Sequence, residues 1–114
     1  MNKNTFNKLY RLLLQKASAV RTAKESEYFS EEDILRNLRR IGKFRNSNTP
    51  QVIMNLAAKH FQSLSDMIDY EFPKDSEKSP VQPIAPEVWD EKFVDSLNYL
   101  FKLYVSIKEE RGDF

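Results

Sequence analysis

The sequence predicts an all-α domain built like a four-helix bundle. Apolar residues recur at steps of three and four along four stretches, which is the period of one face of a helix. Residues that favour helix starts precede these stretches, and proline or glycine lies where helices begin or end. No stretch shows the strict alternation of apolar and polar residues that is typical of a half-buried strand.

The most strongly patterned stretch is residues 86–111. Pro86 suits the first turn of a helix, and Gly112 suits the position just after its end. The main apolar stripe of this helix is expected to face the core and consists of Trp89, Phe93, Leu97, Leu100, Tyr104 and Ile107. A second apolar flank is formed by Val94, Phe101 and Val105. Two apolar flanks exceed what one neighbouring helix covers, so we expect this helix at a bundle centre or at a dimer seam.

Two further helices are expected in the first half of the chain. Residues 5–28 keep helical apolar spacing, with Asn4 or Thr5 as the cap. Residues 31–44 follow Ser30, whose hydroxyl is a good cap, and acidic residues fill their first turn.

The third helix is expected over residues 50–70, with Thr49 as cap and Pro50 in the first turn. Residues 71–85 combine several prolines with charged residues and few apolar ones. Because such a segment cannot offset its ordering entropy by burial, we expect an extended, mobile crossover there. Its length exceeds the usual helix connection, which favours a role as a lid or an interface arm. Residues 1–114 are thus expected to form a single helical domain.

Composition excludes several classes of site. The chain of 114 residues contains no cysteine, so it has no disulfide, thiolate nucleophile or cysteine–zinc site. A single histidine, His60, cannot form a histidine-rich metal site, and two glycines leave little room for a glycine-rich phosphate loop. No apolar run approaches the roughly 20 residues of a membrane span. We therefore expect no membrane partner and a cytoplasmic location, and the net charge of +1 does not favour nucleic acid.

Polar side chains form a column on the last helix, where Glu91, Asp95 and Asn98 lie at helical steps. Two carboxylates one turn apart can hold Mg²⁺, and an amide one turn further on can orient it or contact a base. Lys102 completes the column, which is equally typical of a solvated helix face.

Cations form two more candidate sites. Arg36, Arg40 and Lys43 share one face of the second helix with Arg39, where they could pair with phosphate oxygens or remain solvated. Lys59 lies beside His60 on the third helix and could reach a phosphate or extend to water. A histidine on an apolar stripe is more often a core residue than a ligand.

Three segments, residues 27–41, 53–60 and 91–99, carry a family resemblance. A tyrosine-containing turn leads into a helix with an asparagine, a second helix carries an internal lysine, and a last helix carries an acid followed by aspartate and an aromatic residue. The matching positions are Tyr28, Asn37, Lys59, Glu91, Asp95 and Tyr99. This pattern resembles the small, phage-associated branch of the MazG-like all-α nucleotide pyrophosphohydrolase superfamily.

The resemblance implies a helical bundle completed by dimerisation into a homodimer or a higher oligomer. It also implies Mg²⁺-dependent hydrolysis of nucleoside triphosphates to monophosphate and pyrophosphate. Glu91 and Asp95 would be the catalytic, metal-binding acids. The residues expected to neutralise phosphates or to position base, sugar or water are Lys59, Arg36, Arg40, Asn37 and Asn98.

One departure from the family pattern favours binding over turnover. The family pairs an ExxE motif with an ExxD motif on the next helix, whereas this chain has no ExxE and has Lys92 where the second motif would begin with glutamate. The alternative function is a non-enzymatic phage interaction protein. It would bind a host protein or nucleic acid through the basic stripe of residues 36–43 or through the arm of residues 71–85. A purely structural bundle is the third possibility.

Overall fold

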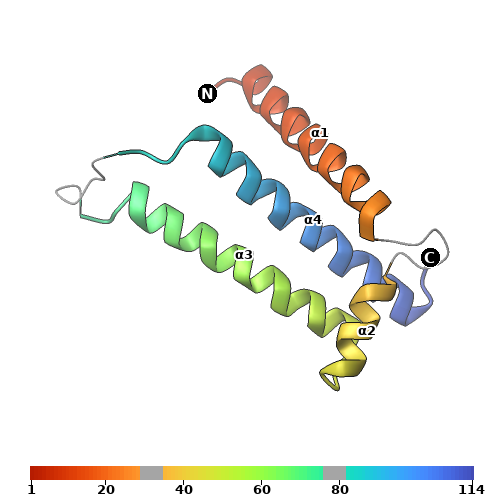
Figure 1. Cartoon of the computed structure of the whole chain (residues 1–114). Coiled ribbons are helices and arrows are strands. Elements are labelled where there is room, and N and C mark those ends of the chain that lie inside the picture. The colour runs from red at the N-terminus through yellow and green to blue at the C-terminus, as the bar shows by residue number, and fades with distance from the viewer. Residues whose placement is uncertain (29–34, 76–81) are drawn as a thin grey trace.

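The computed structural model describes residues 1–28, 35–75 and 82–114 (Figure 1). Within these ranges the chain forms helices and no strand, which confirms the predicted all-α, four-helix bundle-like fold. The helices are α1 (Lys3–Tyr28), α2 (Arg36–Phe44), α3 (Thr49–Glu71) and α4 (Pro86–Arg111). None of the helices in the described part of the chain is both long enough and apolar enough to cross a membrane.

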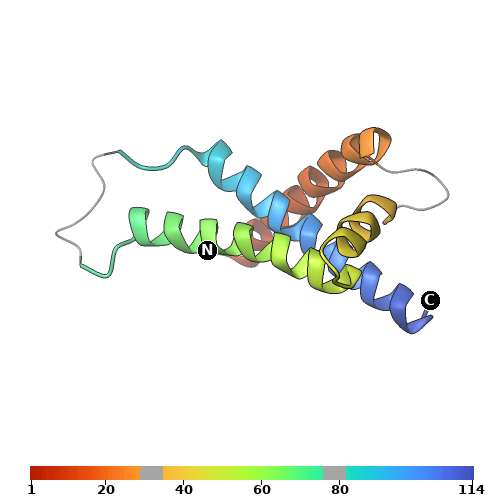
Figure 2. The ribbon, with the colours of Figure 1, turned by 60° about the horizontal axis from the view of Figure 1, so that its bottom comes forward.

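The helix α4 lies between α1 and α3 and packs against both (Figure 1). It runs antiparallel to α3 and is crossed by α1 at a steep angle, as Figure 2 shows, and the short α2 packs on the end of α3 where that helix begins (Figures 1 and 2). The radius of gyration is 17.1 Å, whereas a compact chain of this length has a value of about 13 Å. The three long helices therefore spread out, and much of the surface of α4 is left uncovered.

Asparagine side chains cap the first turns of α1 and α3. The Asn2 Oδ1 atom accepts a hydrogen bond of 2.8 Å from the Thr5 backbone N–H. Asn2, rather than Asn4 or Thr5, is therefore the cap of α1, which begins at Lys3. The cap of α3 is Asn48, whose Oδ1 atom accepts a backbone hydrogen bond. This cap lies one residue before the predicted Thr49. The start predicted for the second helix, with its Ser30 cap, lies outside the described residues.

The ends of α4 follow from proline and glycine. Pro86 is its first residue, and Gly112 follows its last residue with φ of +64°, in the left-handed region. Glycine adopts this conformation at little cost because it has no Cβ. The backbone N–H groups of Gly112 and Asp113 donate to carbonyl groups of the last turn of α4, which satisfies otherwise unpaired acceptors.

The buried core is small and joins α2, α3 and α4. Ile53 and Val52 of α3 have exposed fractions of 0% and 1%, and Leu35 and Leu38 pack against them from the α2 side. The surrounding side chains are only partly buried: Ile41, Leu56, Tyr99, Leu103 and Val105. This cluster fixes α2 and α4 on α3 and so positions the residues of the candidate site.

The prediction that the main apolar stripe of α4 faces the core is wrong. Its members Phe93, Leu100, Tyr104 and Ile107 have exposed fractions between 42% and 58%. The buried residues of α4 are Val94, Ser96 and Ser106. Periodicity shows that residues share a face, but it does not show which face the neighbouring helices cover.

Of the predicted crossover, residues 71–85, Glu71 is the last residue of α3. Residues 72–75 and 82–85 are extended or bent rather than helical, and residues 76–81 lie outside the description. The Tyr70 hydroxyl donates to the Gln82 carbonyl at 2.9 Å. The Trp89 indole N–H donates to the Glu71 carboxylate at 2.5 Å. The two ends of the crossover are thereby fastened to α3 and α4.

Candidate functional site

A cleft of about 350 Å³ opens where α1, α2 and α4 meet. We call it the cationic cleft, because three cations and one acid line it. Its lining residues are Arg21, Lys24, Asn37, Leu38, Asp95, Asn98, Tyr99 and Lys102. A volume of this size falls in the range of small-molecule sites, and the excess of positive charge favours an anion.

The cations come from two helices, α1 and α4. Arg21 and Lys24 are one turn apart near the end of α1, and Lys102 lies on α4. The Arg21 guanidinium carbon lies 5.3 Å from the centre of the Phe101 ring, which places the arginine head between α1 and α4. The Lys102 Nζ atom lies 4.8 Å from the centre of the Tyr99 ring. The Tyr99 contact holds the Lys102 ammonium group at the cleft wall, whereas Phe101 lies in the adjoining groove, which Arg21 also lines.

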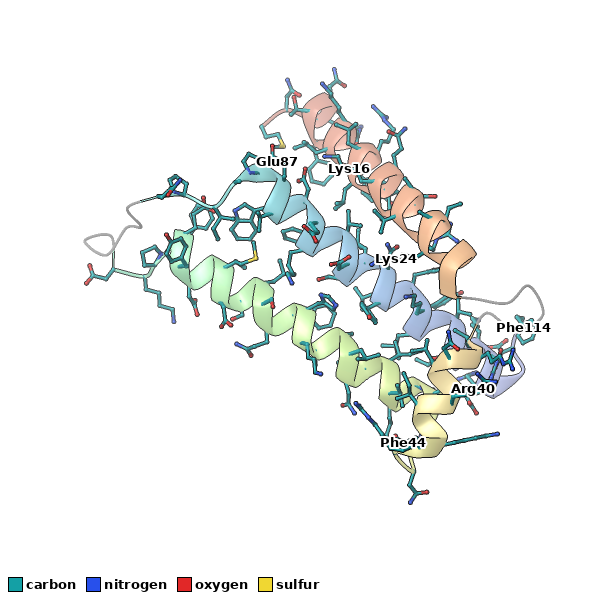
Figure 3. The ribbon with its side chains drawn as sticks, in the orientation of Figure 1. Lys16, Lys24, Arg40, Phe44, Glu87 and Phe114 are labelled. Carbon is teal, nitrogen blue, oxygen red and sulfur yellow. The ribbon has the colours of Figure 1, made fainter. Side chains whose placement is uncertain are left out.

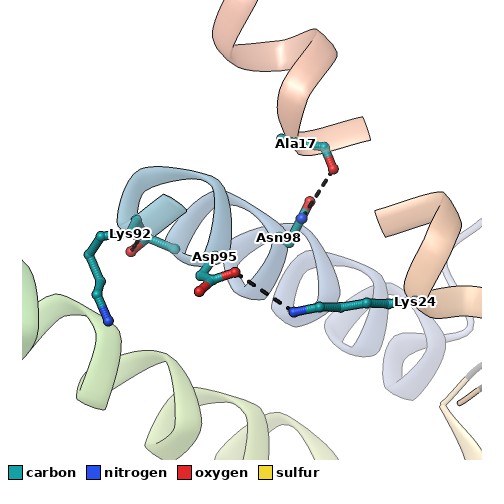
Figure 4. Close-up of polar contacts among 6 residues, drawn as sticks. Ala17, Lys24, Lys92, Asp95 and Asn98 are labelled. Carbon is teal, nitrogen blue, oxygen red and sulfur yellow. Dashed lines mark hydrogen bonds and ion pairs between the residues drawn. The ribbon is translucent and has the colours of Figure 1, made fainter. Parts of the chain in front are cut away.

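Asp95 is the acid of the cleft. Its Oδ1 atom lies 3.8 Å from the Lys24 Nζ atom, and the two side chains meet across the gap between α1 and α4 (Figure 4). The Asp95 side chain is 19% exposed, whereas that of Lys24 is 51% exposed. A pair with such an open partner contributes about 0–1 kcal/mol, because water and salt screen it. Lys24 can therefore exchange Asp95 for a phosphate oxygen at little cost.

Asparagines contribute two further cleft residues. The Asn98 Nδ2 atom donates to the Ala17 carbonyl at 3.1 Å, which ties α4 to α1 (Figure 4). Asn37 reaches the cleft from α2. Both amides were predicted as site residues, and the hydrogen bond gives Asn98 a structural part as well.

His60 lies behind the cleft and stacks on Tyr99, with ring centres 4.8 Å apart. Its Nδ1 atom is buried and has no hydrogen-bond partner among the described residues. Burial lowers the pKa of His60; the charge of Asp95 opposes this shift, while Lys92, Lys24 and Lys102 add to it. A neutral imidazole is thus favoured, and it supports the Tyr99 ring at the cleft wall.

The other predicted site residues lie outside the lining of the cleft. Lys59 is exposed on α3, next to His60 in sequence but on a different side of the helix. Arg36 and Arg40 are exposed on α2, whose buried side carries Leu38 (Figure 3 labels Arg40). Glu91 is exposed, one turn before Asp95 on α4. The spacing thus placed Glu91 and Asp95 correctly on one helix side, yet only Asp95 lies within the lining.

Sequence reasoning missed Arg21 and Lys24, and it noted Lys102 only as the end of the polar column on the last helix. The available signal was the helical spacing of α1. Ala17 is buried against α4, and Arg21 and Lys24 follow it at steps of four and three on the same side of the helix. Cations that extend a buried stripe lie at the edge of a helix interface.

A metal site formed by the protein alone does not fit the described residues, since they contain no group of three or more histidine, cysteine or acidic side chains that could hold an ion. Mg²⁺ usually binds through one or two carboxylates together with substrate phosphates. Asp95 fits that arrangement as a single carboxylate, and Glu91 is the nearest acid on the same side of α4 by helical spacing.

The basic face of α2 is a second, separate feature. Arg39 forms an ion pair with Glu109 of α4 and so helps to fix α2. Arg36, Arg40 and Lys43 are exposed, as is the neighbouring Phe44, and Figure 3 shows Arg40 and Phe44 on this helix.

No protein-family model, no curated protein and no solved structure matches this chain.

Proposed function

We propose that this chain is a MazG-like nucleotide-binding protein and that the cationic cleft is its nucleotide site. The observation that carries the proposal is the convergence of Arg21, Lys24 and Lys102 on one small cleft. Guanidinium and ammonium groups form charge-assisted hydrogen bonds with phosphate oxygens, which are among the stronger polar contacts in proteins. The phosphates of the bound nucleotide lie against these cations.

The asparagines supply the neutral contacts. Asn37 presents an amide to the cleft from α2, and such a group can both donate to and accept from a base or a sugar. Asn98 already donates to Ala17, so its contribution is to hold α1 and its cations in place.

The proposal extends to Mg²⁺-dependent hydrolysis of a nucleoside triphosphate to monophosphate and pyrophosphate, as the MazG-like resemblance implies. Asp95, with Glu91 one turn away, would hold the ion together with the phosphates. The ion would supply charge neutralisation and an activated water. Asp95 also limits binding in the absence of metal, because its carboxylate repels phosphate.

The test is a thermal-shift panel of nucleoside triphosphates and deoxynucleoside triphosphates, with and without Mg²⁺, and a parallel assay of pyrophosphate release. A ligand that binds the native state raises the melting temperature by mass action. We expect a nucleotide-dependent rise that Lys24→Gln reduces. Lys16→Gln is the matched control, because Lys16 also lies on α1 and pairs with an acid of α4, Asp90, but does not line the cleft. No shift with any nucleotide would contradict the proposal.

The exposed cations of α2 favour a second candidate, a non-enzymatic protein that binds a host protein or nucleic acid. Arg36 and Arg40 are the residues to reverse, because Arg39 is engaged with Glu109 and its loss would disturb the fold. A partner that is captured from host lysate by the parent but lost in Arg36→Glu/Arg40→Glu would favour this candidate if nucleotides leave the melting temperature unchanged.

A further inference from the structure

The cationic cleft and the basic face of α2 adjoin at Asn37. This residue lines the cleft, and Arg40 and Phe44 follow it on α2 at steps of three and four. Such steps place all three residues in one row along the same side of a helix, and we call it the α2 row. At 1.5 Å per residue the row is about 10 Å long. Figure 3 shows Arg40 and Phe44 on α2, beyond the end of α1 that carries Lys24.

Positive charge continues from the cleft along α2. After the acidic residues 31–33, residues 34–65 contain lysine and arginine but no acid. Arg36, Arg40 and Lys43 are exposed, and none of them forms an ion pair in the part of the chain that the structure describes. A polyanion that enters the cleft therefore meets further cations along α2, and it meets no acid of α2 itself.

Phe44 ends the row with an aromatic ring that is 91% exposed. Its neighbours in sequence are two cations, Lys43 and Arg45, and both are exposed. Proteins bind single-stranded nucleic acid by combining cations that follow the backbone with aromatic rings on which bases stack. An unpaired base has a face available for such stacking. This side of α2 therefore carries both parts that a single strand requires.

We infer that the ligand of the cationic cleft is the 5′ end of a single strand of nucleic acid. The inference rests on the proposed function and names the substrate class of the same site. The terminal phosphates lie against Arg21, Lys24 and Lys102, and the next nucleotides follow the α2 row, with a base stacked on Phe44. A nucleoside triphosphate carries its phosphates on the 5′ oxygen, so a strand continues from the nucleotide in the cleft through its 3′ oxygen.

The dimensions agree with this arrangement. A cleft of about 350 Å³ lies near the lower end of the range for small-molecule sites, which suits one nucleotide rather than a longer piece of strand. The α2 row of about 10 Å is the length over which roughly three nucleotides stack in one strand, at about 3.4 Å each. Asn37 lies where the two parts meet, and its amide can contact the sugar or base that joins them.

The first test compares a nucleoside 5′-monophosphate with a short single-stranded oligonucleotide that has the same 5′-phosphorylated nucleotide at its end. Both are measured by calorimetry at one salt concentration, and the oligonucleotide is tested as DNA and as RNA. We expect at least one of the two strands to bind about tenfold more tightly than the monophosphate, because it adds phosphate contacts along α2. The tighter of the two identifies the natural sugar.

The 5′ phosphate connects the strand to the cleft. The same oligonucleotide with a 5′ hydroxyl group should bind more weakly than the phosphorylated one, and Lys24→Gln should reduce this difference. Lys16→Gln should preserve it, because Lys16 lies on α1 but does not line the cleft.

A second test addresses the α2 row. Phe44→Ala should weaken binding of the strand at least about fivefold, the loss expected for one stacked base, and should leave the affinity of the monophosphate unchanged. Phe6→Ala is its control, since Phe6 is 65% exposed on α1. Arg40→Gln should lower the salt dependence of strand binding by about 0.7 in the slope of log affinity against log salt, the value of one phosphate contact. Arg11→Gln, at an exposed position of α1, should keep the parent slope.

The inference and the proposed function can fail separately. If nucleoside triphosphates bind in the cleft but neither strand binds more tightly than the monophosphate, only the inference is wrong. Strand binding that is independent of the 5′ phosphate or of Phe44 would also overturn it, as would a blunt duplex of the same sequence that binds as tightly as the strand. If neither nucleotides nor strands bind, both are wrong.

Discussion

The Lys24 ammonium group lies 3.8 Å from the Asp95 carboxylate, joining the end of α1 to the middle of α4. The two residues are far apart in sequence, and their contact defines the polar wall of the cationic cleft (Figure 4). Lys24 is thereby held at a cleft where Arg21 and Lys102 add positive charge. The properties of the cleft follow from this balance of one acid against several cations.

Asp95→Asn should separate the repulsion of phosphate by Asp95 from its binding of metal. Without divalent ions, we expect the variant to bind a nucleoside triphosphate at least as tightly as the parent, because a carboxylate near the phosphates is removed. With Mg²⁺, the variant should lose the gain in affinity that the ion gives the parent. Isothermal titration calorimetry in EDTA and in Mg²⁺ measures both effects, with Asp90→Asn as the control. An equal gain from Mg²⁺ in Asp95→Asn would exclude Asp95 as a ligand of the ion.

His60 should make stability depend on pH. Because burial lowers its pKa in the folded chain below the unfolded value of 6.5, the unfolded state binds more protons in the window between the two values. The free energy of unfolding should therefore fall as pH decreases from 6.5 through the folded pKa. Urea titrations across this window should show a smaller fall in His60→Phe, which keeps an aromatic ring next to Tyr99. The same pH dependence in both proteins would contradict this role.

Gly42→Ala should destabilise the fold although alanine usually favours helices. A Cβ atom at position 42 would lie 2.8 Å from the Ser47 carbonyl oxygen, which belongs to the backbone and cannot move freely. Such overpacking typically costs about 1–3 kcal/mol, whereas glycine to alanine in an unhindered helix gains about 1 kcal/mol. The sign of the change in a denaturant titration decides between the two, and a stabilised variant would show that α2 and the following turn are not packed this closely.

Ile53→Ala tests the central packing of α3. Its side chain is fully buried between α2 and α4, so we expect a loss of about 2–5 kcal/mol in the free energy of unfolding. Met54→Ala is a neighbouring control, because Met54 is 45% exposed, and surface substitutions usually change stability by less than about 0.5 kcal/mol. Similar losses in both variants would contradict the placement of the core.

The helices could be predicted because their signals are local. Pro86 and Gly112 fix the ends of α4 through their own backbone preferences, and apolar steps of three and four mark the helix between them. The shift of the α1 cap to Asn2 shows the limit of such signals, since several neighbouring residues have suitable side chains and only one lies at the turn that forms.

The site could be predicted only in part because it depends on which helices become neighbours. Asp95 and Asn98 were found from their spacing on one helix, but spacing cannot show that Lys24 of α1 approaches them. Arg36 and Lys59 appeared equally suitable in sequence, yet the packing of Leu38 and Ile53 directs these cations to solvent. The exposure of Phe93, Leu100 and Tyr104 on α4 has the same origin, because the apolar pattern of a helix is independent of what covers it.

The most direct test of the account is the affinity of a nucleoside triphosphate for the double variant Lys24→Gln/Lys102→Gln, measured by calorimetry at fixed salt. Each lost charge-assisted contact should cost roughly 1.5–3 kcal/mol, so we predict a loss of affinity of at least about 100-fold. Lys8→Gln/Lys16→Gln removes the same charge from exposed positions of α1 outside the cleft and should bind like the parent. Equal affinities in the two double variants would contradict the assignment of the cleft as the nucleotide site.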